Sequence, residues 1–269
     1  MENDLVSVIV ACYNGESYID ECLESIVNQS YQNIEILICD DASTDDSYAM
    51  LKKWQIKESR IVLLRNNQNV HSAGSRNACI DLAKGKYVLI QDIDDISKVN
   101  RVSVLVNTIK NNKVDFVSSR MATIDDSGQI DYNNILKHKK SPSKYDFLWG
   151  ISFNHPATLF RKEILNKVNG YRVAKETRGA EDYDMFMRMY AYGAKGINIS
   201  ETLYLYRTVA ADSKMLNFKN RIKECKIRYK GFKQLNILVI GFPMVFKPLI
   251  VLVIKFFFYI LSRPKIRTG

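Results

Sequence analysis

Three acidic side chains lie within four residues of the sequence, at Asp92, Asp94 and Asp95. Carboxylates this close repel one another unless a cation neutralises their charge. Oxygen ligands in small number suit Mg²⁺ or Mn²⁺ when substrate phosphates complete the coordination shell. The chain has neither a Walker A run nor a G-x-G-x-x-G fingerprint, so the phosphates are not expected to sit in a dedicated loop. These residues therefore favour a metal-bridged nucleoside diphosphate as ligand.

Two more polar groups directly follow apolar runs that contain β-branched residues. Residues 13–15 (Tyr-Asn-Gly) follow the run 7–12, and the acidic segment 40–45 follows the run 34–39. Taken singly, each group is also typical of a turn or a helix N-cap. In open α/β sheets, however, ligands bind beyond the carboxyl ends of the strands. The three groups together therefore predict a ligand site at one edge of a sheet.

The elements that must hold these groups alternate along the chain. Short apolar runs typical of buried strands are followed by segments with apolar residues at helical spacing. Strands are predicted at 7–12, 34–39, 61–64, 87–91 and 116–118, and helices after Gly15 and around 46–56, 73–83 and 99–111. This alternation predicts an α/β domain, in which helices cover both faces of a mostly parallel sheet.

Size and composition agree with a globular body. The chain has 269 residues, of which 46% are apolar and 25% charged, which excludes a disordered, collagenous or multi-span chain. Its five cysteines are an odd number without CxxC spacing. We expect them to be small buried thiols in a reducing cytosol rather than disulfides or a metal cluster. The acidic start, residues 1–4, does not resemble a secretory signal, so we expect the body in the cytoplasm.

Positive charge is concentrated at the end of the chain. The formal net charge is +10, and residues 214–269 contain thirteen basic side chains and one acidic one, which leaves −2 for residues 1–213. A local basic surface suits anionic lipid head groups or nucleic acid. Aromatic residues are too sparse among the basic ones to favour RNA, so an anionic membrane surface is the preferred partner and nucleic acid is not expected.

Residues 214–269 divide into a basic part and an apolar part. Residues 214–234 carry apolar side chains at helical spacing between the charges, which predicts a basic amphipathic helix. The apolar stretch 235–261 is interrupted by Gly241, Pro243, Lys247, Pro248 and Lys255. A lysine near mid-bilayer costs about 2.5–3.5 kcal/mol on insertion scales. We therefore expect membrane-associated helices that lie in the membrane or re-enter it, with a true span and a soluble core helix as alternatives.

Several segments resemble, in order and spacing, the family 2 inverting glycosyltransferases of GT-A fold. They are residues 7–14, 25–31, 35–45, 74–77 and 91–95, followed by 154–161 and the Glu-Asp-containing segment 179–184. The resemblance covers roughly residues 5–210 and implies a Rossmann-like GT-A domain. Within it, residues 1–120 would be the nucleotide-sugar-binding half and residues 121–213 the acceptor-side half, with 214–269 as a membrane-associating tail.

The resemblance also implies roles for the donor-side residues. The backbone around Ala11 and the Tyr13 side chain would flank the uracil of a UDP-sugar, and Asp41 would accept a hydrogen bond from the base. Asp92 would contact the ribose, and Arg76 would approach the diphosphate. Asp40, which precedes Asp41, would be structural, although an exchange of the two roles stays open. A helix-surface ion pair is the alternative for Arg76.

The remaining implied roles concern the metal and the chemical step. Asp94, the second acid of a DxD-like motif, would bind Mn²⁺ or Mg²⁺. In an inverting transfer the acceptor hydroxyl attacks from the face opposite the leaving diphosphate, so a general base must face the metal. The resemblance assigns that base to Asp182, with Glu181 positioning it or contacting the acceptor. Carboxylates favoured by the helix dipole in a first helical turn are the structural alternative for this pair.

The chain departs from the family pattern at one position. Many relatives carry a histidine shortly after the pair that corresponds to Tyr206-Arg207, and residues 208–213 contain none. Arg207, Asp212 or water would fill its place, or His155 would reach inward from its own segment. For His155 we favour a structural hydrogen bond over metal ligation.

These expectations lead to a metal-dependent inverting hexosyl- or N-acetylhexosaminyltransferase at the cytoplasmic face of the membrane. It would move a sugar from a UDP-sugar to a lipid-linked saccharide during surface polysaccharide or glycoconjugate assembly. One alternative uses a polyprenyl phosphate itself as the acceptor. A second is a non-catalytic scaffold that keeps the fold and binds lipid or nucleic acid, against which the complete carboxylate set argues.

Overall fold

The first half of the chain alternates strands and helices, as the sequence predicts. The computed structural model describes residues 4–132, 138–208 and 218–261, with side chains through residue 254. The elements of this half are β1 (Val6–Cys12), α1 (Ile19–Val27), β2 (Ile34–Asp40), α2 (Ser47–Lys57), β3 (Ile61–Arg65), α3 (His71–Leu82), β4 (Tyr87–Asp92) and α4 (Arg101–Asn112). Their bounds lie within a few residues of the predicted ones.

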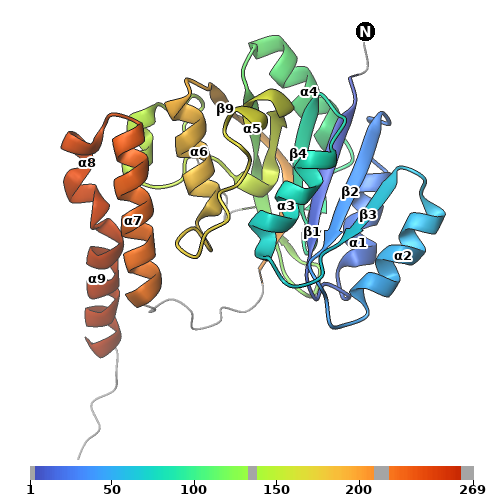
Figure 1. The fold of residues 1–269 in the computed structure, drawn as a ribbon, viewed down its shortest axis with the longest axis horizontal. Helices are drawn as coiled ribbons and strands as arrows, with labels where there is room; N and C mark the ends of the chain where they lie inside the picture. The colour runs from blue at the N-terminus through green and yellow to red at the C-terminus, as the bar shows by residue number, and fades with distance from the viewer. Residues whose placement is uncertain (1–3, 133–137, 209–217, 262–269) are drawn as a thin grey trace, which may run out of the picture.

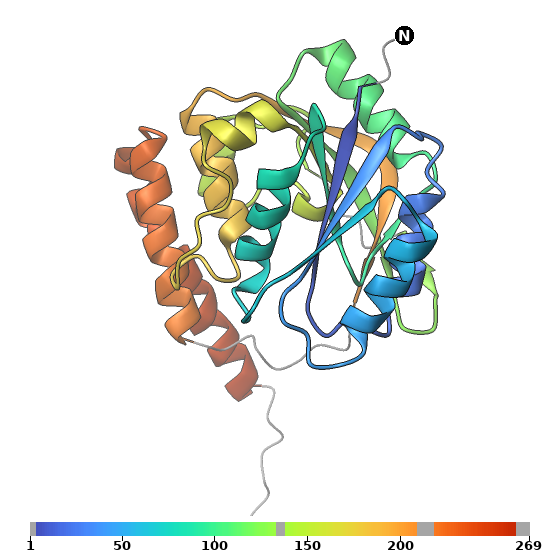
Figure 2. The ribbon, with the colours of Figure 1, turned by 45° about the vertical axis from the view of Figure 1, so that its right-hand side comes forward.

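These four strands form a parallel sheet in the order β3-β2-β1-β4. The order reverses at β1, because β2 and β4 flank it on opposite sides, and such a switch point opens a crevice at the carboxyl ends of the strands. Helix α3 packs on one face of the sheet, and α1, α2 and α4 pack on the other. Figure 2 shows α2 and α3 on opposite sides of the strands.

The rest of the sheet is mixed, so the expectation of a mostly parallel sheet is wrong for this half. Its strands are β5 (Ile96–Ser97), β6 (Phe116–Ile124), β7 (Ile130–Asp131), β8 (Thr158–Arg161) and β9 (Gly196–Arg207). Strand β8 lies between β4 and β6 and is antiparallel to both, while β6 and β9 are parallel. The chain enters β8 through the short 3₁₀ turns η1 (Lys144–Leu148) and η2 (His155–Ala157). The residues described between β7 and β8 contain no helical crossover of the kind that a parallel strand requires.

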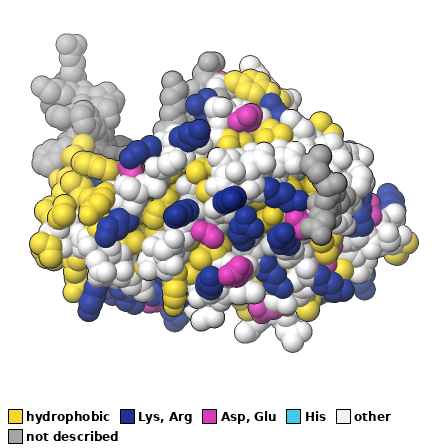
Figure 3. Space-filling view, turned by 90° about the horizontal axis from the view of Figure 1, so that it is seen from above, with side chains coloured by type: hydrophobic (Ala, Val, Ile, Leu, Met, Phe, Trp, Pro, Cys, Tyr) yellow, Lys and Arg dark blue, Asp and Glu magenta, His cyan; other side chains and the backbone are white. Residues whose placement is uncertain are grey.

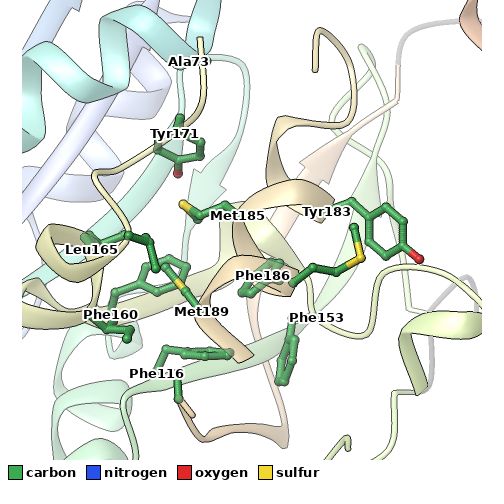
Figure 4. Packing of buried hydrophobic residues seen from close by; sticks show 14 of the residues in the cluster. Ala73, Phe116, Phe153, Phe160, Leu165, Tyr171, Tyr183, Met185, Phe186 and Met189 are labelled. Carbon is green, nitrogen blue, oxygen red and sulfur yellow. The ribbon is translucent and has the colours of Figure 1, made fainter. Parts of the chain in front are cut away.

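An aromatic cluster joins this mixed half to α6 (Glu181–Ala191), and the aliphatic side chains of α5 (Lys162–Lys167) pack in the same core. The Phe116 ring centroid lies 4.8 Å from that of Phe153 and 5.3 Å from that of Phe186 (Figure 4). Gly196 on β9 makes room for the cluster, since a Cβ atom there would lie 2.1 Å from the Phe116 ring. The cluster therefore fixes α6 against the sheet. All five cysteines are buried as free thiols, as expected.

Three helices end the described chain: α7 (Phe218–Gln234), α8 (Leu238–Val245) and α9 (Lys247–Leu261). Helix α7 packs on α6, and α8 and α9 pack on α7 (Figure 1). Cys225, Ile227 and Phe232 of α7 belong to the main core, so the apolar side of the predicted basic helix is covered by protein. None of the described helices combines the length and apolar character needed to cross a membrane. Residues 214–217 and 262–269 of the predicted tail lie outside the described residues.

Helices α8 and α9 carry exposed hydrophobic side chains. We call this set the α8–α9 apolar surface; its members are Val239, Ile240, Phe242, Phe246, Ile250, Val253 and Ile254. Figure 3 shows hydrophobic side chains gathered at the end of the molecule where α8 lies, close to lysine and arginine. Apolar residues this exposed, and this close together, are typical of an interaction surface.

The aromatic cluster predicts a large loss of stability for Phe186→Ala. Phe186 is fully buried, and truncating a buried phenylalanine costs about 3–5 kcal/mol because transfer energy is lost and a cavity is left. Urea denaturation followed by circular dichroism measures this. Ile56→Ala, at a side chain that is 87% exposed on α2, is the control and should change the free energy of unfolding by less than about 0.5 kcal/mol. Equal effects would contradict the packing described.

Candidate active site

The donor-side residues lie together at the carboxyl edge of the parallel strands. Ala11 on β1 pairs in register with Cys39 on β2 and with Asp92 on β4. Tyr13 follows β1 and is 49% exposed, which leaves its ring available to a ligand. The sheet register therefore brings the predicted donor residues Ala11 and Asp92 to one level at the switch point, and Tyr13 follows directly after the end of β1.

The two aspartates at the end of β2 differ in their surroundings. Asp40 is fully buried and forms an ion pair with Arg65, whose Nε lies 3.1 Å from Asp40 Oδ2. Asp41 Oδ1 accepts hydrogen bonds from Asn66 Nδ2 at 2.8 Å and from the backbone N–H of Val70 at 2.9 Å. Its Oδ2 has no hydrogen-bond partner among the described residues. The ion pair agrees with the structural role expected of Asp40, and Asp41 keeps one carboxylate oxygen that could accept a hydrogen bond from a ligand.

Arg76 on α3 connects the donor-side and acceptor-side carboxylates. Its guanidinium is almost fully buried, with Nη2 2.6 Å from Asp92 Oδ1 and Nη1 3.7 Å from Glu181 Oε1. Burial would raise the pKa of Asp92, but the adjoining guanidinium outweighs it and holds that pKa below its ordinary value. Arg76 is therefore charged and ion-paired inside the site, and the alternative of a helix-surface ion pair does not describe it.

The acidic triplet holds more negative charge than its protein neighbours neutralise. Burial and the charge of Asp92 raise the pKa of Asp94, and burial with both neighbouring carboxylates raises the pKa of Asp95 to about 8. Asp95 Oδ1 accepts the backbone N–H of Arg207 at 2.7 Å and is directed into the protein. The described residues contain no group of three or more His, Cys, Asp or Glu side chains that could hold a metal. A divalent ion bound by Asp94 and completed by diphosphate oxygens fits this donor set.

Arg207 and His155, the two described candidates for the place of the missing histidine, are both held by other protein groups. The buried Arg207 guanidinium is held by the Glu21 carboxylate and donates from Nε to the Asp94 carbonyl at 2.9 Å. His155 Nε2 lies 2.6 Å from the Tyr171 hydroxyl, which agrees with the structural role favoured for this residue. Burial lowers the pKa of His155 to about 3, so its ring is neutral at physiological pH. Asp212 lies outside the described residues.

The predicted catalytic pair begins helix α6. Glu181 Oε1 accepts the Ser72 hydroxyl at 2.9 Å, and its Oε2 accepts the Gly179 backbone N–H at 2.7 Å. Gly179 adopts a φ of +80°, which favours glycine. Burial raises the pKa of Asp182 to about 6, and the charge of Glu181 adds to the increase. A carboxylate with this pKa can take up a proton near neutral pH, as a general base must.

Two clefts meet at this pair. The first, of about 440 Å³, lies between the start of α3 and the segment 173–179 and is lined by Glu181. The second, of about 400 Å³, lies between the start of α6 and the first half of α7 and is lined by Asp182; we call it the α6–α7 cleft. Both volumes fall within the roughly 300–1,000 Å³ of small-molecule sites. The two carboxylates therefore serve different clefts.

Arg101 and Tyr204 support the site and were not among the residues predicted from the sequence. Arg101 is fully buried and donates from Nη1 to Gln91 Oε1 at 2.8 Å and to Ser97 Oγ at 2.7 Å. The Tyr204 hydroxyl accepts the Asp92 backbone N–H at 3.1 Å across 112 positions of sequence. These contacts hold the end of β4 and the loop after it. An arginine that opens a helix gives no sign of burial, and no sequence signal would have identified either residue.

Comparison with known proteins shows the family. Residues 7–168 match the family described as glycosyl transferase family 2. The chain is 33% identical to EpsE of Bacillus subtilis (strain 168) over 247 residues, 91% of this chain and 88% of that protein. It is 30% identical to the Escherichia coli UDP-Glc:alpha-D-GlcNAc-diphosphoundecaprenol beta-1,3-glucosyltransferase WfaP over 224 residues, 83% of this chain and 85% of that protein.

Two solved structures share the fold. Staphylococcus aureus TarS 1–349 in complex with UDP-GlcNAc superposes with a TM-score of 0.69 at 19% identity, over 87% of this chain and 71% of that one. The Pyrobaculum calidifontis mannosyltransferase PcManGT, with GDP-Man and Mn²⁺, gives a TM-score of 0.63 at 18% identity, over 91% and 74%. The family match, the aligned relatives and the shared fold confirm the resemblance that the motifs indicated. The chain belongs to glycosyl transferase family 2 and is a glycosyltransferase of GT-A fold.

Proposed function

We propose that the protein transfers a sugar, with inversion, from a UDP-sugar to a hydroxyl of a lipid-linked saccharide in surface polysaccharide or glycoconjugate assembly. The observation that carries this proposal is the Arg76 contact with both Asp92 and Glu181. It brings the predicted ribose-binding carboxylate next to the predicted catalytic pair. Because Asp182 directly follows Glu181, a donor held at Asp92 would lie close to the proposed base, which is the geometry that a single displacement needs.

Asp94 would hold the divalent ion, Mn²⁺ or Mg²⁺, together with the diphosphate of the donor. When bound, such an ion neutralises the charge that develops on the departing UDP. Arg76 is fixed by Asp92 at 2.6 Å and adds positive charge on the same side. The protein thus offers cationic stabilisation where the leaving group forms.

Asp182 would take the proton from the acceptor hydroxyl. The hydroxyl oxygen bonds to the anomeric carbon while the bond from that carbon to the diphosphate oxygen breaks, so the product has inverted configuration and UDP leaves. Glu181 does not need to take part in proton transfer, because Ser72 and the Gly179 N–H hold its carboxylate in place. Its role is to position the start of α6 and Arg76.

The comparisons support the substrate classes in this proposal. The name of the aligned Escherichia coli relative gives UDP-Glc as donor and GlcNAc-diphosphoundecaprenol as acceptor. The TarS structure contains UDP-GlcNAc, and the Pyrobaculum calidifontis structure contains Mn²⁺ beside a nucleotide sugar. A screen of UDP-Glc, UDP-Gal, UDP-GlcNAc and UDP-GalNAc for Mn²⁺-dependent release of UDP tests the proposal directly. Release of UDP from none of them, with or without a lipid-linked acceptor, would contradict it.

The proposed site of action is the cytoplasmic face of the membrane. Val239 is 94% exposed and Ile240 67% exposed on α8, and Ile250 and Val253 are each 53% exposed on α9. Trp149, at the end of η1, is 65% exposed and its carbonyl accepts a hydrogen bond from Lys247 at the start of α9. Exposed aliphatic residues beside tryptophan and lysine are typical of surfaces that rest at a membrane interface.

Asp94→Ala is expected to abolish turnover and to remove the part of UDP affinity that depends on Mn²⁺. Neither Asp92, bound to Arg76, nor Asp95, bound to the Arg207 backbone, can replace its carboxylate. Calorimetric titration of UDP with and without Mn²⁺ measures the effect, and EDTA should reproduce it in the wild type. Asp126→Ala, at an exposed carboxylate, is the control. If the Mn²⁺-dependent part of UDP affinity is unchanged in Asp94→Ala, Asp94 is not the metal ligand.

Asp182→Asn should lower turnover by about 10²–10⁴, the range for loss of a general base, while UDP affinity stays within about threefold. The base acts as the carboxylate, so the wild-type rate should rise with pH through an apparent pKa of about 6. The charge of Glu181 raises the pKa of Asp182. Removing that charge in Glu181→Gln should therefore shift the rise of the rate to lower pH. Rates measured from pH 5 to 8 test both statements. Near-normal turnover in Asp182→Asn would place the base elsewhere.

Replacing three residues of the α8–α9 apolar surface should release the protein from membranes at high salt. Salt screens the attraction of lysine and arginine to anionic lipid but not the burial of apolar area. Wild type is expected to co-sediment with phosphatidylglycerol vesicles in 1 M NaCl, and Ile240→Ser/Phe246→Ser/Ile250→Ser is not. The matched control replaces the exposed Ile56, Val62 and Leu82 with serine. Complete release of the wild-type protein from vesicles at 1 M NaCl would contradict insertion of the α8–α9 apolar surface into the membrane.

A further inference from the structure

The α6–α7 cleft is richer in positive than in negative charge. It contains the cations Arg178, Arg221, Lys223 and Arg228 and the carboxylates Asp182 and Glu224. Three of the cations come from α7, and the sequence predicts an anionic membrane surface as the partner of the charges on this helix. The structure places these three cations in the cleft that Asp182 also lines. A surplus of cations inside a cleft, rather than on an open face, selects for an anionic ligand.

Glu224 neutralises only part of this charge. Arg221 Nη1 lies 3.0 Å from Glu224 Oε2, and Arg228 Nε lies 3.5 Å from Glu224 Oε1. Arg228 is buried, and its Nε makes no hydrogen bond within the described part of the chain. Arg178 and Lys223 have no carboxylate partner among the residues that the structure describes. Arg178 and Lys223, which are not buried, therefore leave donors available to a ligand in the cleft.

We infer that this cleft binds the acceptor through its phosphate groups: Arg178, Arg221 and Lys223 hold a phosphate or diphosphate ester while a sugar hydroxyl of the same molecule meets Asp182. This inference rests on the proposed function, since it assigns the acceptor side of the same site. Guanidinium and ammonium groups form strong charge-assisted hydrogen bonds with phosphate oxygens. The volume of about 400 Å³ suits a sugar with its phosphate groups.

A lipid tail on such a phosphate has a path away from the cleft. Helix α9 lies alongside α7, and α7 begins on the side of the molecule away from the N-terminus, where β1 and β4 end (Figure 1). The helix that lines the cleft thus also contacts the helix that carries part of the α8–α9 apolar surface. An acceptor can place its anionic group in the cleft and its alkyl chain along that surface.

Two soluble probes separate recognition of the phosphate from recognition of the sugar. One is an undecyl chain joined to α-GlcNAc through a diphosphate, and the other is the same chain joined directly to α-GlcNAc. Binding is measured by calorimetry on the full chain saturated with UDP and Mn²⁺. Wild type is expected to bind the diphosphate probe at least about tenfold more tightly than the uncharged one, because charge-assisted hydrogen bonds form only with the former.

The variant Arg178→Gln/Lys223→Gln should remove most of this difference, weakening the diphosphate probe by about tenfold and the uncharged probe by less than twofold. The matched control Lys226→Gln/Lys233→Gln removes the same charge from outside the cleft and should change both affinities by less than twofold. UDP affinity should stay the same in both variants. A preference for the diphosphate probe that survives in the first variant, or that falls equally in the control, would overturn the inference.

Two further measurements distinguish this inference from the proposed function and from binding of membrane head groups. Loss of UDP-sugar turnover in the wild type with an intact probe preference would contradict the proposed function and leave the phosphate site standing. Binding to phosphatidylglycerol vesicles tests the other source of phosphate. If Arg178→Gln/Lys223→Gln weakens binding to vesicles while the two probes bind it as they bind wild type, the cations serve the membrane head groups and the acceptor assignment is wrong.

Discussion

The buried guanidinium of Arg76 is the interaction on which the rest of the site depends. A charge taken out of water is costly unless carboxylates compensate it, and here they come from β4 and from the start of α6. The ion pairs therefore connect the parallel half of the sheet to the helix that bears Asp182. Removing either carboxylate would leave the buried cation short of a partner and would loosen the connection between the two halves. If Asp92 binds the donor and Asp182 is the base, as proposed, donor binding and base positioning are coupled through one side chain.

The parallel half of the fold could be predicted because strong local signals agree there. Buried strands such as 34–39 and amphipathic segments such as that after Gly15 have periodicities that differ clearly, and the switch point follows from their alternation. The mixed half lacked such signals: β8 has four residues, and its antiparallel direction results from turns that no periodicity marks. The motifs selected Asp94 and Asp182 as candidates, whereas the supporting Arg101 and Tyr204 depend on contacts that only the folded chain creates.

The basic side chains near the end of the chain differ in their surroundings, which a count of charges does not show. Counting located an excess of cations after residue 213, but it could not distinguish charges that face solvent from those that line a cleft. Arg228 is buried and donates to the Leu148 carbonyl at 3.1 Å, while Lys226 is exposed on the same helix. Because Cys225 and Phe232 dock α7 on the core, its charged sides are held in fixed directions. The helix that was expected to face lipid thereby also forms one wall of the α6–α7 cleft.

If the acceptor is a lipid-linked saccharide, as proposed, the docking of α7 on α6 has a consequence for the length of saccharide that the enzyme extends. If the α8–α9 apolar surface rests on a bilayer, the height of Asp182 above the lipid is fixed by helix packing and not by a flexible tether. A growing saccharide that is anchored by its lipid would then present the correct hydroxyl at only one stage of its growth. The fixed distance between the membrane and Asp182 would then select acceptors by the number of sugars between the phosphate and the free end of the saccharide.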